Sequence, residues 1–167
     1  AMTAVAASST AMTAVAASST AMTAVAASST AMTAVAASAV ALSVIAKSTS
    51  AATSMELALQ SYRAAIISTL DAATTLFGKV TTNVGDGTGT FDAGAGTNTF
   101  YVPTACVDDD DTVFNVQSPL RSYASVVSIA GHSGSVAVST GLTLRGVRVY
   151  GTGSTVGYVT FSVYTAV

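Results

Sequence analysis

The first forty residues consist of four copies of a ten-residue unit, and this repeat limits what the chain can fold into more than any other feature. The unit AMTAVAASST occurs three times without a change, and the fourth copy, AMTAVAASAV, differs only in its last two residues. A tandem repeat presents the same surface again and again along a line. Catalysis requires unlike side chains that converge on one point, so the repeat predicts a structural role based on length or periodic contact.

Glycine and proline divide the chain into two parts. All 13 glycines and both prolines lie at or after Gly78, and residues 1–77 contain neither. Because Gly and Pro interrupt regular structure and Ala is the best helix former, residues 1–77 are predicted to form one uninterrupted helix. Such a helix would be a rod of about 115 Å. Gly78 followed by Lys79 fits a helix C-cap, which places the predicted boundary at Phe77–Gly78.

The end of this first part carries an apolar stripe with helical spacing. Its members recur at steps of three and four residues: Met55, Leu59, Tyr62, Ile66, Leu70, Ala73 and Phe77. Glu56, Arg63 and Asp71 lie off the stripe and are expected to face solvent. The spacing is close to a heptad and predicts a parallel homo-oligomeric coiled coil. The alternative is an amphipathic helix that packs on its own domain.

The repeat itself does not share this geometry. Its Met and Val residues alternate at steps of three and seven, as in Met2, Val5, Met12 and Val15. With a serine position filling the longer step, the period is about 3.3 residues per turn, against 3.6 for an α-helix. A strongly overwound bundle, a helix that packs on all sides, or a β- or mixed solenoid that turns back after each unit would each accommodate this period. The unit contains no Gly, Asn or Pro to make turns, so a continuous helix is the favoured interpretation.

The second part of the chain is predicted to be β-structure. Nine of the eleven Phe and Tyr residues lie there, in short segments bounded by Gly, Asp, Pro or Ser. The candidate strands are TFYV near Phe100, TVFNV near Phe114, SYASVVSIA, SVAVS, LTLRGVRVY and GYVTFSVYTAV. In the last of these, Val159, Phe161 and Val163 face one way, and Tyr158, Thr160, Ser162 and Tyr164 the other. Six or more short strands predict a compact antiparallel β-sandwich.

The segment LTLRGVRVY contains a change of phase. Its two leucines and the two valines that follow share one face only if a residue is skipped at Arg145–Gly146. A glycine at such a position predicts a β-bulge. Arg145 and Arg148 would then both point away from the core.

Composition excludes several classes of function. Only 8% of residues are charged and the net charge is −2, so no basic patch exists and nucleic acid is not expected as a partner. The single cysteine allows neither an internal disulfide nor a zinc motif. Residues 1–46 carry no charge, but each unit has Ser or Thr at four of ten positions, so neither a membrane span nor a signal peptide is expected. A chain with so few charges is expected to associate with itself.

No motif in the chain predicts an enzyme, a metal site or a cofactor. The run Asp108–Asp111 is expected to be an exposed acidic turn, because its adjacent carboxylates lack the spacing of a calcium loop. The GDGTG segment at Gly85–Gly89 precedes no helix and is interpreted as a flexible neck. His132 is the only histidine, which leaves no histidine pair for a metal and no marked triad for hydrolysis. Cys106 is expected to be a small buried residue.

One group of residues in the β part is suited to contact with another molecule. Two arginines and three tyrosines could form an exposed aromatic and cationic surface: Arg145, Arg148, Tyr150, Tyr158 and Tyr164. Such residues favour contact with carbohydrate or protein. They would equally suit an interface between subunits, and the sequence leaves both interpretations open.

The whole layout resembles that of tailed-bacteriophage fibre proteins. The features that carry this resemblance are the AMTAVAASST units, the helical stretch after them and the C-terminal run LRGVRVYGTGSTVGYVTFSVYTAV. The resemblance implies a homotrimer in the virion. It also implies a stalk held by other virion proteins at its N-terminal side and a distal tip that binds a host-surface glycan or protein. Since residue 1 is Ala, the repeats are expected to continue upstream.

Together these observations predict a segregated α+β fold with three parts. Residues 1–77 are expected to form a long coiled-coil-like oligomeric stalk, 78–98 a Gly-rich neck and 99–167 a small antiparallel β-sandwich tip. The predicted function is that of a structural virion fibre or spike whose tip registers the trimer and contacts the host. The alternatives are a microbial cell-surface adhesin stalk or extracellular filament subunit and, third, an ice-binding helix with regular threonines.

Overall fold

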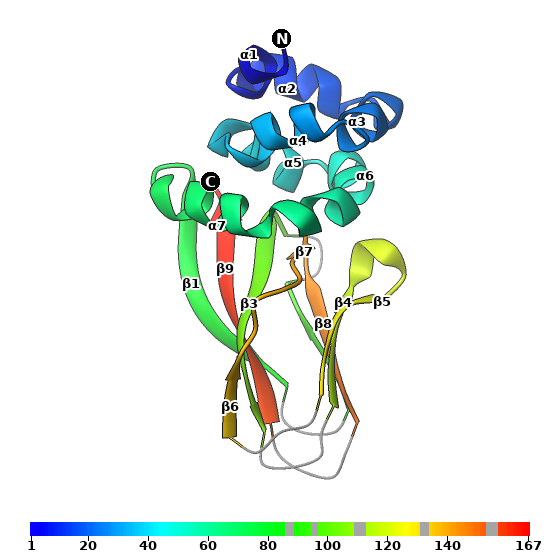
Figure 1. Ribbon diagram of the computed structural model, residues 1–167, viewed down its shortest axis with the longest axis vertical. Coiled ribbons are helices and arrows are strands. Elements are labelled where there is room, and N and C mark those ends of the chain that lie inside the picture. The colour runs from blue at the N-terminus through cyan, green and yellow to red at the C-terminus, as the bar shows by residue number, and fades with distance from the viewer. Residues whose placement is uncertain (86–88, 95–96, 109–112, 131–133, 153–156) are drawn as a thin grey trace. The chain divides into compact units, whose positions relative to one another are not determined.

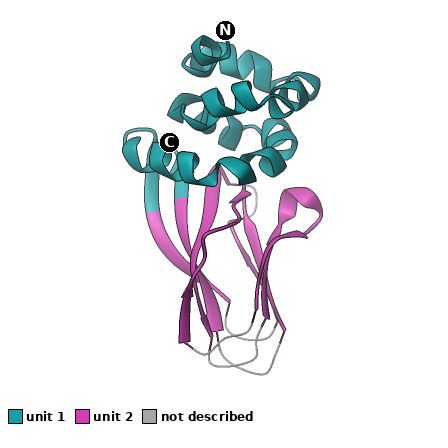
Figure 2. Ribbon diagram, viewed as in Figure 1, with its two compact units in different colours: residues 1–79, 164–167 teal, residues 80–163 magenta. Residues whose placement is uncertain are grey.

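The computed structural model describes residues 1–85, 89–94, 97–108, 113–130, 134–152 and 157–167. The chain divides into two compact units, each of which is described by itself (Figure 2). The first unit comprises Ala1–Lys79 together with Tyr164–Val167, and the second comprises Val80–Val163. The division falls within the first and last strands of the chain, and the first of these two points, after Lys79, lies inside the segment 78–98 that was predicted as a neck.

The first unit is built from short helices, and the predicted long coiled-coil stalk is wrong. A new helix begins in every ten-residue unit instead of one helix running through residues 1–77 (Figure 1). The elements are α1 (Met2–Ala6), α2 (Ser9–Ala16), α3 (Ser19–Ala26), α4 (Ser29–Ala36), α5 (Ala39–Lys47), α6 (Thr49–Leu59), the 3-10 helix η1 (Gln60–Tyr62) and α7 (Arg63–Ala72). Helices α4 and α5 meet at 95°.

The serine at the eighth position of each unit makes the corner. Ser18 has an extended backbone, with φ −112° and ψ 111°, and its Oγ accepts the N–H of Ala21 at 3.2 Å. Ala17 before it keeps a right-handed helical conformation. The same cap occurs at Ser8, Ser28, Ser38 and Ser48. One extended residue with a side-chain cap is therefore enough to end one helix and start the next, without any positive φ. The prediction that this serine lies on the stripe of a continuous helix is therefore wrong.

The helices coil into a solenoid with three units per turn. Helix α1 packs on α4, α2 on α5 and α3 on α6 (Figure 1). Hydroxyl groups connect successive turns: the Ser38 hydroxyl donates to the carbonyl of Ala6, and the Thr69 hydroxyl donates to the carbonyl of Ala36 at 2.8 Å. Each turn buries the apolar side of its neighbour, which is the general source of stability in repeat proteins. The decapeptide period is thus that of a solenoid, but one built from helices rather than the β- or mixed solenoid considered as an alternative.

The interior of the solenoid is lined by the second and sixth positions of the unit. Met12, Met22, Met32 and Leu42 are buried there. Methionine fills irregular interior space well because its side chain is unbranched and flexible. Among the described residues, no single helix is long and apolar enough to cross a membrane, and only the bent pair α4 and α5 meets the length and composition test when taken together.

Most of the apolar stripe is buried, but within this chain rather than in the predicted coiled coil, and the charged residues and the helix end also differ from expectation. Met55, Leu59, Ile66 and Leu70 are buried, whereas Tyr62 and Ala73 are half-buried. Glu56 is also fully buried, because the corners turn the sixth position of its unit toward the solenoid interior. Arg63 is half-buried, and Asp71 alone of the three charged residues is exposed.

The last helix ends five residues before the predicted boundary. Helix α7 ends at Ala72, and Phe77 and Gly78 lie at the start of strand β1. Gly78 is therefore not a helix C-cap. The short turn after Ala72 is closed by the N–H of Phe77, which donates to the carbonyl of Ala73 at 3.0 Å.

Two β-sheets make up the second unit, except that the ends of β1 and β9 belong to the first unit. The strands are β1 (Phe77–Val84), β2 (Gly89–Ala93), β3 (Thr99–Asp108), β4 (Val113–Ser118), β5 (Ala124–Ile129), β6 (Gly134–Ala137), β7 (Thr143–Leu144), β8 (Val147–Thr152) and β9 (Gly157–Ala166), with a 3-10 helix η2 (Pro119–Arg121) before β5. One sheet has the order β1-β9-β3-β6, with β7 also paired to β3. The other has the order β2-β8-β4-β5 with antiparallel pairs throughout. This arrangement fits the sandwich expected from the sequence in broad terms.

The core of the second unit lies between these sheets. Tyr101 and Phe161 meet edge to face there, with ring centroids 6.1 Å apart and planes at 78°. The predicted alternation in β9 is confirmed for Val159, Phe161 and Val163, which are buried. Tyr164 departs from it, since this residue belongs to the first unit and is buried there.

The phase change at Arg145–Gly146 is present, but it is not a bulge within one strand. Strand β7 before it pairs with β3 in one sheet, and β8 after it pairs with β2 and β4 in the other. The chain thus passes from sheet to sheet at this point. Arg145 and Gly146 both have positive φ, at 59° and 135°, which allows the abrupt change of direction.

Candidate binding surface

The five residues predicted to form one aromatic and cationic surface lie in separate places. Tyr164 is 1% exposed, and its hydroxyl donates to Asp71 Oδ1 at 2.8 Å in the first unit. Tyr158 is half-buried on β9, in the other sheet from β8. Arg145 lies at the passage between sheets, where its guanidinium donates to Asn98 Oδ1 at 3.2 Å. The structure brings together only Arg148 and Tyr150, both on β8.

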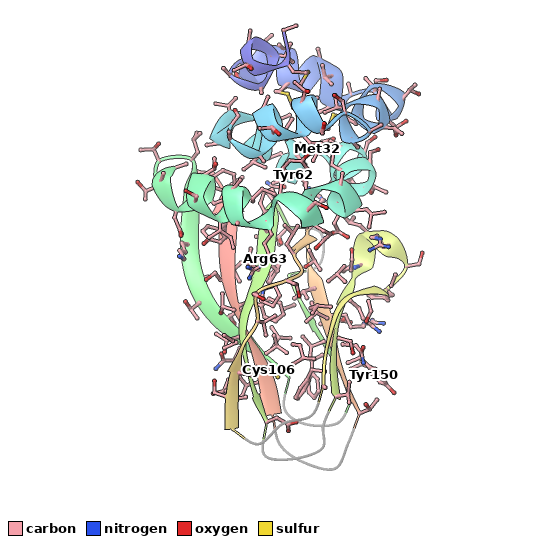
Figure 3. All side chains as sticks on the ribbon, viewed as in Figure 1. Met32, Tyr62, Arg63, Cys106 and Tyr150 are labelled. Carbon is pink, nitrogen blue, oxygen red and sulfur yellow. The ribbon has the colours of Figure 1, made fainter. Side chains whose placement is uncertain are left out.

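Arg148 and Tyr150 lie on the outer face of the β2-β8-β4-β5 sheet. Val147 and Val149 of the same strand are buried, so the alternation of β8 turns Arg148 and Tyr150 away from the core. Figure 3 shows Tyr150 on the outer side of this sheet. The strand register places Asp92 and Gln117 beside Arg148, and Thr90 and Asn115 beside Tyr150.

Asp92 and Tyr123 hold the guanidinium of Arg148 in place. Arg148 Nε donates to Asp92 Oδ1 at 2.7 Å, and a terminal nitrogen donates to Oδ2 at 2.8 Å. The guanidinium carbon lies 3.5 Å from the centroid of the Tyr123 ring. A fork-like pair with a carboxylate and a stacked aromatic ring both fix the plane of an arginine. The hydrogen bond from Arg148 lowers the pKa of the Asp92 carboxyl, so the pair stays ionised to a lower pH than a free aspartate would.

Tyr123 is held in an unusual backbone conformation. Ser122 and Tyr123 have consecutive positive φ values of 52° and 62°, and the Tyr123 N–H donates to the carbonyl of Ser118 at 2.8 Å. Non-glycine residues in the left-handed region cost of the order of 1 kcal/mol each and cluster at functional sites. The left-handed conformation of these two residues orients the Tyr123 ring so that it contacts Arg148 and is partly exposed to solvent.

We call this surface the tyrosine–arginine face, and its members are Asp92, Asn115, Gln117, Tyr123, Arg148 and Tyr150. Both tyrosines are 40% exposed, so part of each ring is accessible to a ligand and the rest is covered by the protein. The neighbouring amides can donate and accept hydrogen bonds. The face is therefore equipped to bind a molecule that has flat apolar patches and many hydroxyl or amide groups.

Asp92 and Tyr123 were not among the surface residues predicted from the sequence. Asp92 has a local signal, since the alternation of TFDA in residues 90–93 places it on a polar face. Nothing local connects it to Arg148, 56 residues later. Tyr123 stands in a turn, where an aromatic residue has no periodicity to reveal its orientation.

Those of the remaining candidate residues that the structure describes do not assemble into a reactive site. Cys106 on β3 is fully buried, and this burial, with a smaller effect of Asp108, raises the pKa of its thiol to about 11. Asp108 is buried as well, so the start of the acidic run is not the exposed turn that was expected. Residues Asp109–Asp111, His132 and the centre of the GDGTG segment lie outside the described residues. Within the described part of the chain, no group of three His, Cys, Asp or Glu side chains could hold a metal ion.

A scan of this sequence against protein-family models finds no match. A search of curated proteins likewise finds no significant match.

Proposed function

We propose that the protein is a non-catalytic fibre or spike protein of a virus particle, and that its tyrosine–arginine face binds a glycan on the host surface. The observation that carries the binding proposal is the fixed position of Arg148 between Asp92 and Tyr123. Groups that are already ordered lose little conformational entropy when a ligand binds. Aromatic rings beside amides and a planar cation suit the apolar faces and hydroxyl groups of sugars.

The role of the repeats in this proposal is that of a spacer. A solenoid grows by a fixed increment for each added turn, so its length follows from the number of decapeptide units. We propose, from the resemblance to fibre proteins, that three copies assemble and that other virion proteins hold the N-terminal side. Three weak contacts made together would give high avidity without a deep pocket.

The test is binding of the fluorescently labelled full chain to cells of candidate bacterial hosts. We expect Tyr150→Ala and Tyr123→Ala each to weaken binding about tenfold or more, since truncating an aromatic contact residue typically costs more than 1 kcal/mol. Tyr158→Ala is the matched control, because this tyrosine lies in the other sheet. Equal binding by all three variants would refute the assignment of the face.

Periodate oxidation of the cell surface distinguishes the kind of ligand. Loss of binding after oxidation of surface sugars would support a glycan, whereas loss only after protease treatment would indicate a protein ligand and contradict this part of the proposal. Sedimentation equilibrium of the full chain tests the trimer, and a monomer at all concentrations would contradict it.

A further inference from the structure

The first turn of the solenoid has an open face that the second turn does not have. The first and fifth positions of the unit are buried in the second turn, at Ala31, Val35, Ala41, Ile45, Ala51 and Met55. The equivalent residues of the first turn remain half-exposed, and they define the open face: Val5, Ala11, Val15, Ala21 and Val25. The second and sixth positions, by contrast, are mostly buried in both turns. The first and fifth positions are therefore the ones that a preceding turn covers.

The structure itself shows what packs on such a face. Helices α2, α3 and α4 have the same eight-residue sequence, STAMTAVA. In α4 this sequence is covered by α1, which comes from another copy of the same unit. The contact is partly directional, since the hydroxyl of Ser38 in the second turn donates to the carbonyl of Ala6 in the first. The serines of the first turn stand at the same position of the unit.

The chemistry of the open face favours an uncharged partner. Residues 1–46 contain no charged side chain, so nothing on this face would steer or specify a charged molecule. The open face carries valines, in the same arrangement that accepts a decapeptide turn elsewhere in the chain.

We propose that the open face of α1–α3 is a docking surface for one further solenoid turn, supplied by a polypeptide segment with the same decapeptide sequence. In the bound state, Val5, Val15 and Val25 are buried as Val35 is buried in the second turn. This inference rests on the first unit alone and does not depend on the proposed glycan binding.

The test is a full chain to which three more copies of AMTAVAASST are fused ahead of Ala1. A second fusion carries the same thirty residues in scrambled order. Hydrogen exchange of the backbone amides in α1–α3 is measured in both fusions and in the parent chain. We expect the repeat extension to slow exchange in α1–α3 about tenfold or more, toward the level of α4–α6, because covering a solenoid turn suppresses its local opening. The scrambled extension should leave it unchanged.

Two substitutions in the extended chain assign the effect to the open face. Val15→Lys should abolish the added protection, because it places a charge in the new interface. Thr13→Lys, on the exposed side of the same helix, should preserve it. Equal exchange in the two fusions would overturn the proposal. So would a concentration-dependent dimer of the parent chain that Val15→Lys abolishes, since a second copy of the whole chain would then cover the face.

Discussion

Ser38 joins two turns of the solenoid through a single oxygen atom. Its Oγ accepts the N–H of Ala41 at 3.2 Å, which caps α5, and the same hydroxyl donates its proton to the carbonyl of Ala6 in the preceding turn. A hydroxyl can do both because it has one donor and two acceptor sites. One side chain therefore serves the local corner and the long-range stacking together.

The dual role of Ser38 predicts a graded loss of stability. Ser18→Ala removes a cap alone and should lower the free energy of unfolding by about 1 kcal/mol. Ser38→Ala removes the cap and the bond to Ala6, and should cost about 1 kcal/mol more. Urea denaturation followed by circular dichroism measures both. Ser19→Ala, at the neighbouring exposed position, is the control and should be neutral; equal losses for Ser18 and Ser38 would contradict the dual role.

Gly94 and Gly78 differ in whether the structure leaves room for a β-carbon. Gly94 has φ +63°, and a β-carbon there would lie 1.7 Å from the Tyr101 hydroxyl oxygen. We expect Gly94→Ala to destabilise the protein by about 1–3 kcal/mol. A β-carbon at Gly78 would meet nothing within 4 Å, and this residue lies in β1, so Gly78→Ala should be neutral or slightly stabilising. Thermal unfolding compares the two, and a large loss for Gly78→Ala would instead favour a left-handed helix cap at that position.

The contacts of Asp71 predict a dependence of stability on pH. Lys79 Nζ lies 2.7 Å from Asp71 Oδ1, and mainly this hydrogen bond lowers the pKa of the carboxyl in the folded state. The stabilisation by the Asp71–Lys79 pair is therefore complete above the pKa of Asp71 in the unfolded chain, about 4. It is lost as the pH falls through the lower pKa of Asp71 in the folded protein. Because the pair is exposed, its contribution should stay below about 1 kcal/mol.

Denaturation midpoints between pH 2 and 6 test this contribution. Asp71→Asn should make the curve flatter below pH 4 than in the wild-type protein. Lys79→Met should have a similar but smaller effect, since Asp71→Asn also alters the hydrogen bond from Tyr164, and the double variant should flatten the curve no further than Asp71→Asn alone. Additive effects of the two substitutions would show that they act independently.

The burial of Cys106 predicts an unreactive thiol. With a pKa of about 11, only about one molecule in a thousand carries the thiolate at pH 8, and the thiolate is the reactive form. Folded protein should therefore react with a disulfide reagent at least a hundredfold more slowly than protein unfolded in guanidinium. Rapid labelling of the folded chain would mean that β3 opens readily or that Cys106 is accessible.

The sequence predicted which type of secondary structure each half contains, but it predicted the arrangement of these elements less well. The distribution of Gly and Pro separated helix from strand, and alternation identified the buried side of β9. The corners of the solenoid were missed because the absence of Gly was given more weight than a serine cap repeated every ten residues. The stacking of one unit on the unit three places later is a contact over 32 or 33 residues, for which a local pattern carries no signal.

The candidate surface was predictable to the extent that it lies within one strand. Arg148 and Tyr150 are two residues apart, so strand periodicity alone puts them on one face. Asp92 and Tyr123 join them only through the order of strands β2, β8, β4 and β5, which the sequence does not reveal. Tyr158 and Tyr164 were grouped with them by residue type, and strand β9 carries both elsewhere.

The stacking of identical units three places apart affects how the protein tolerates the gain or loss of whole repeats in its gene. Nearly identical repeats in a coding sequence invite slippage during copying, which adds or removes whole units. Most such changes are harmful in an ordinary domain, because they displace every later residue from its partner. Here loss of one of the first four units would leave α5 and α6 stacked on units with the same sequence as before. The chain can therefore change length by single decapeptides, each of which adds or removes one third of a solenoid turn.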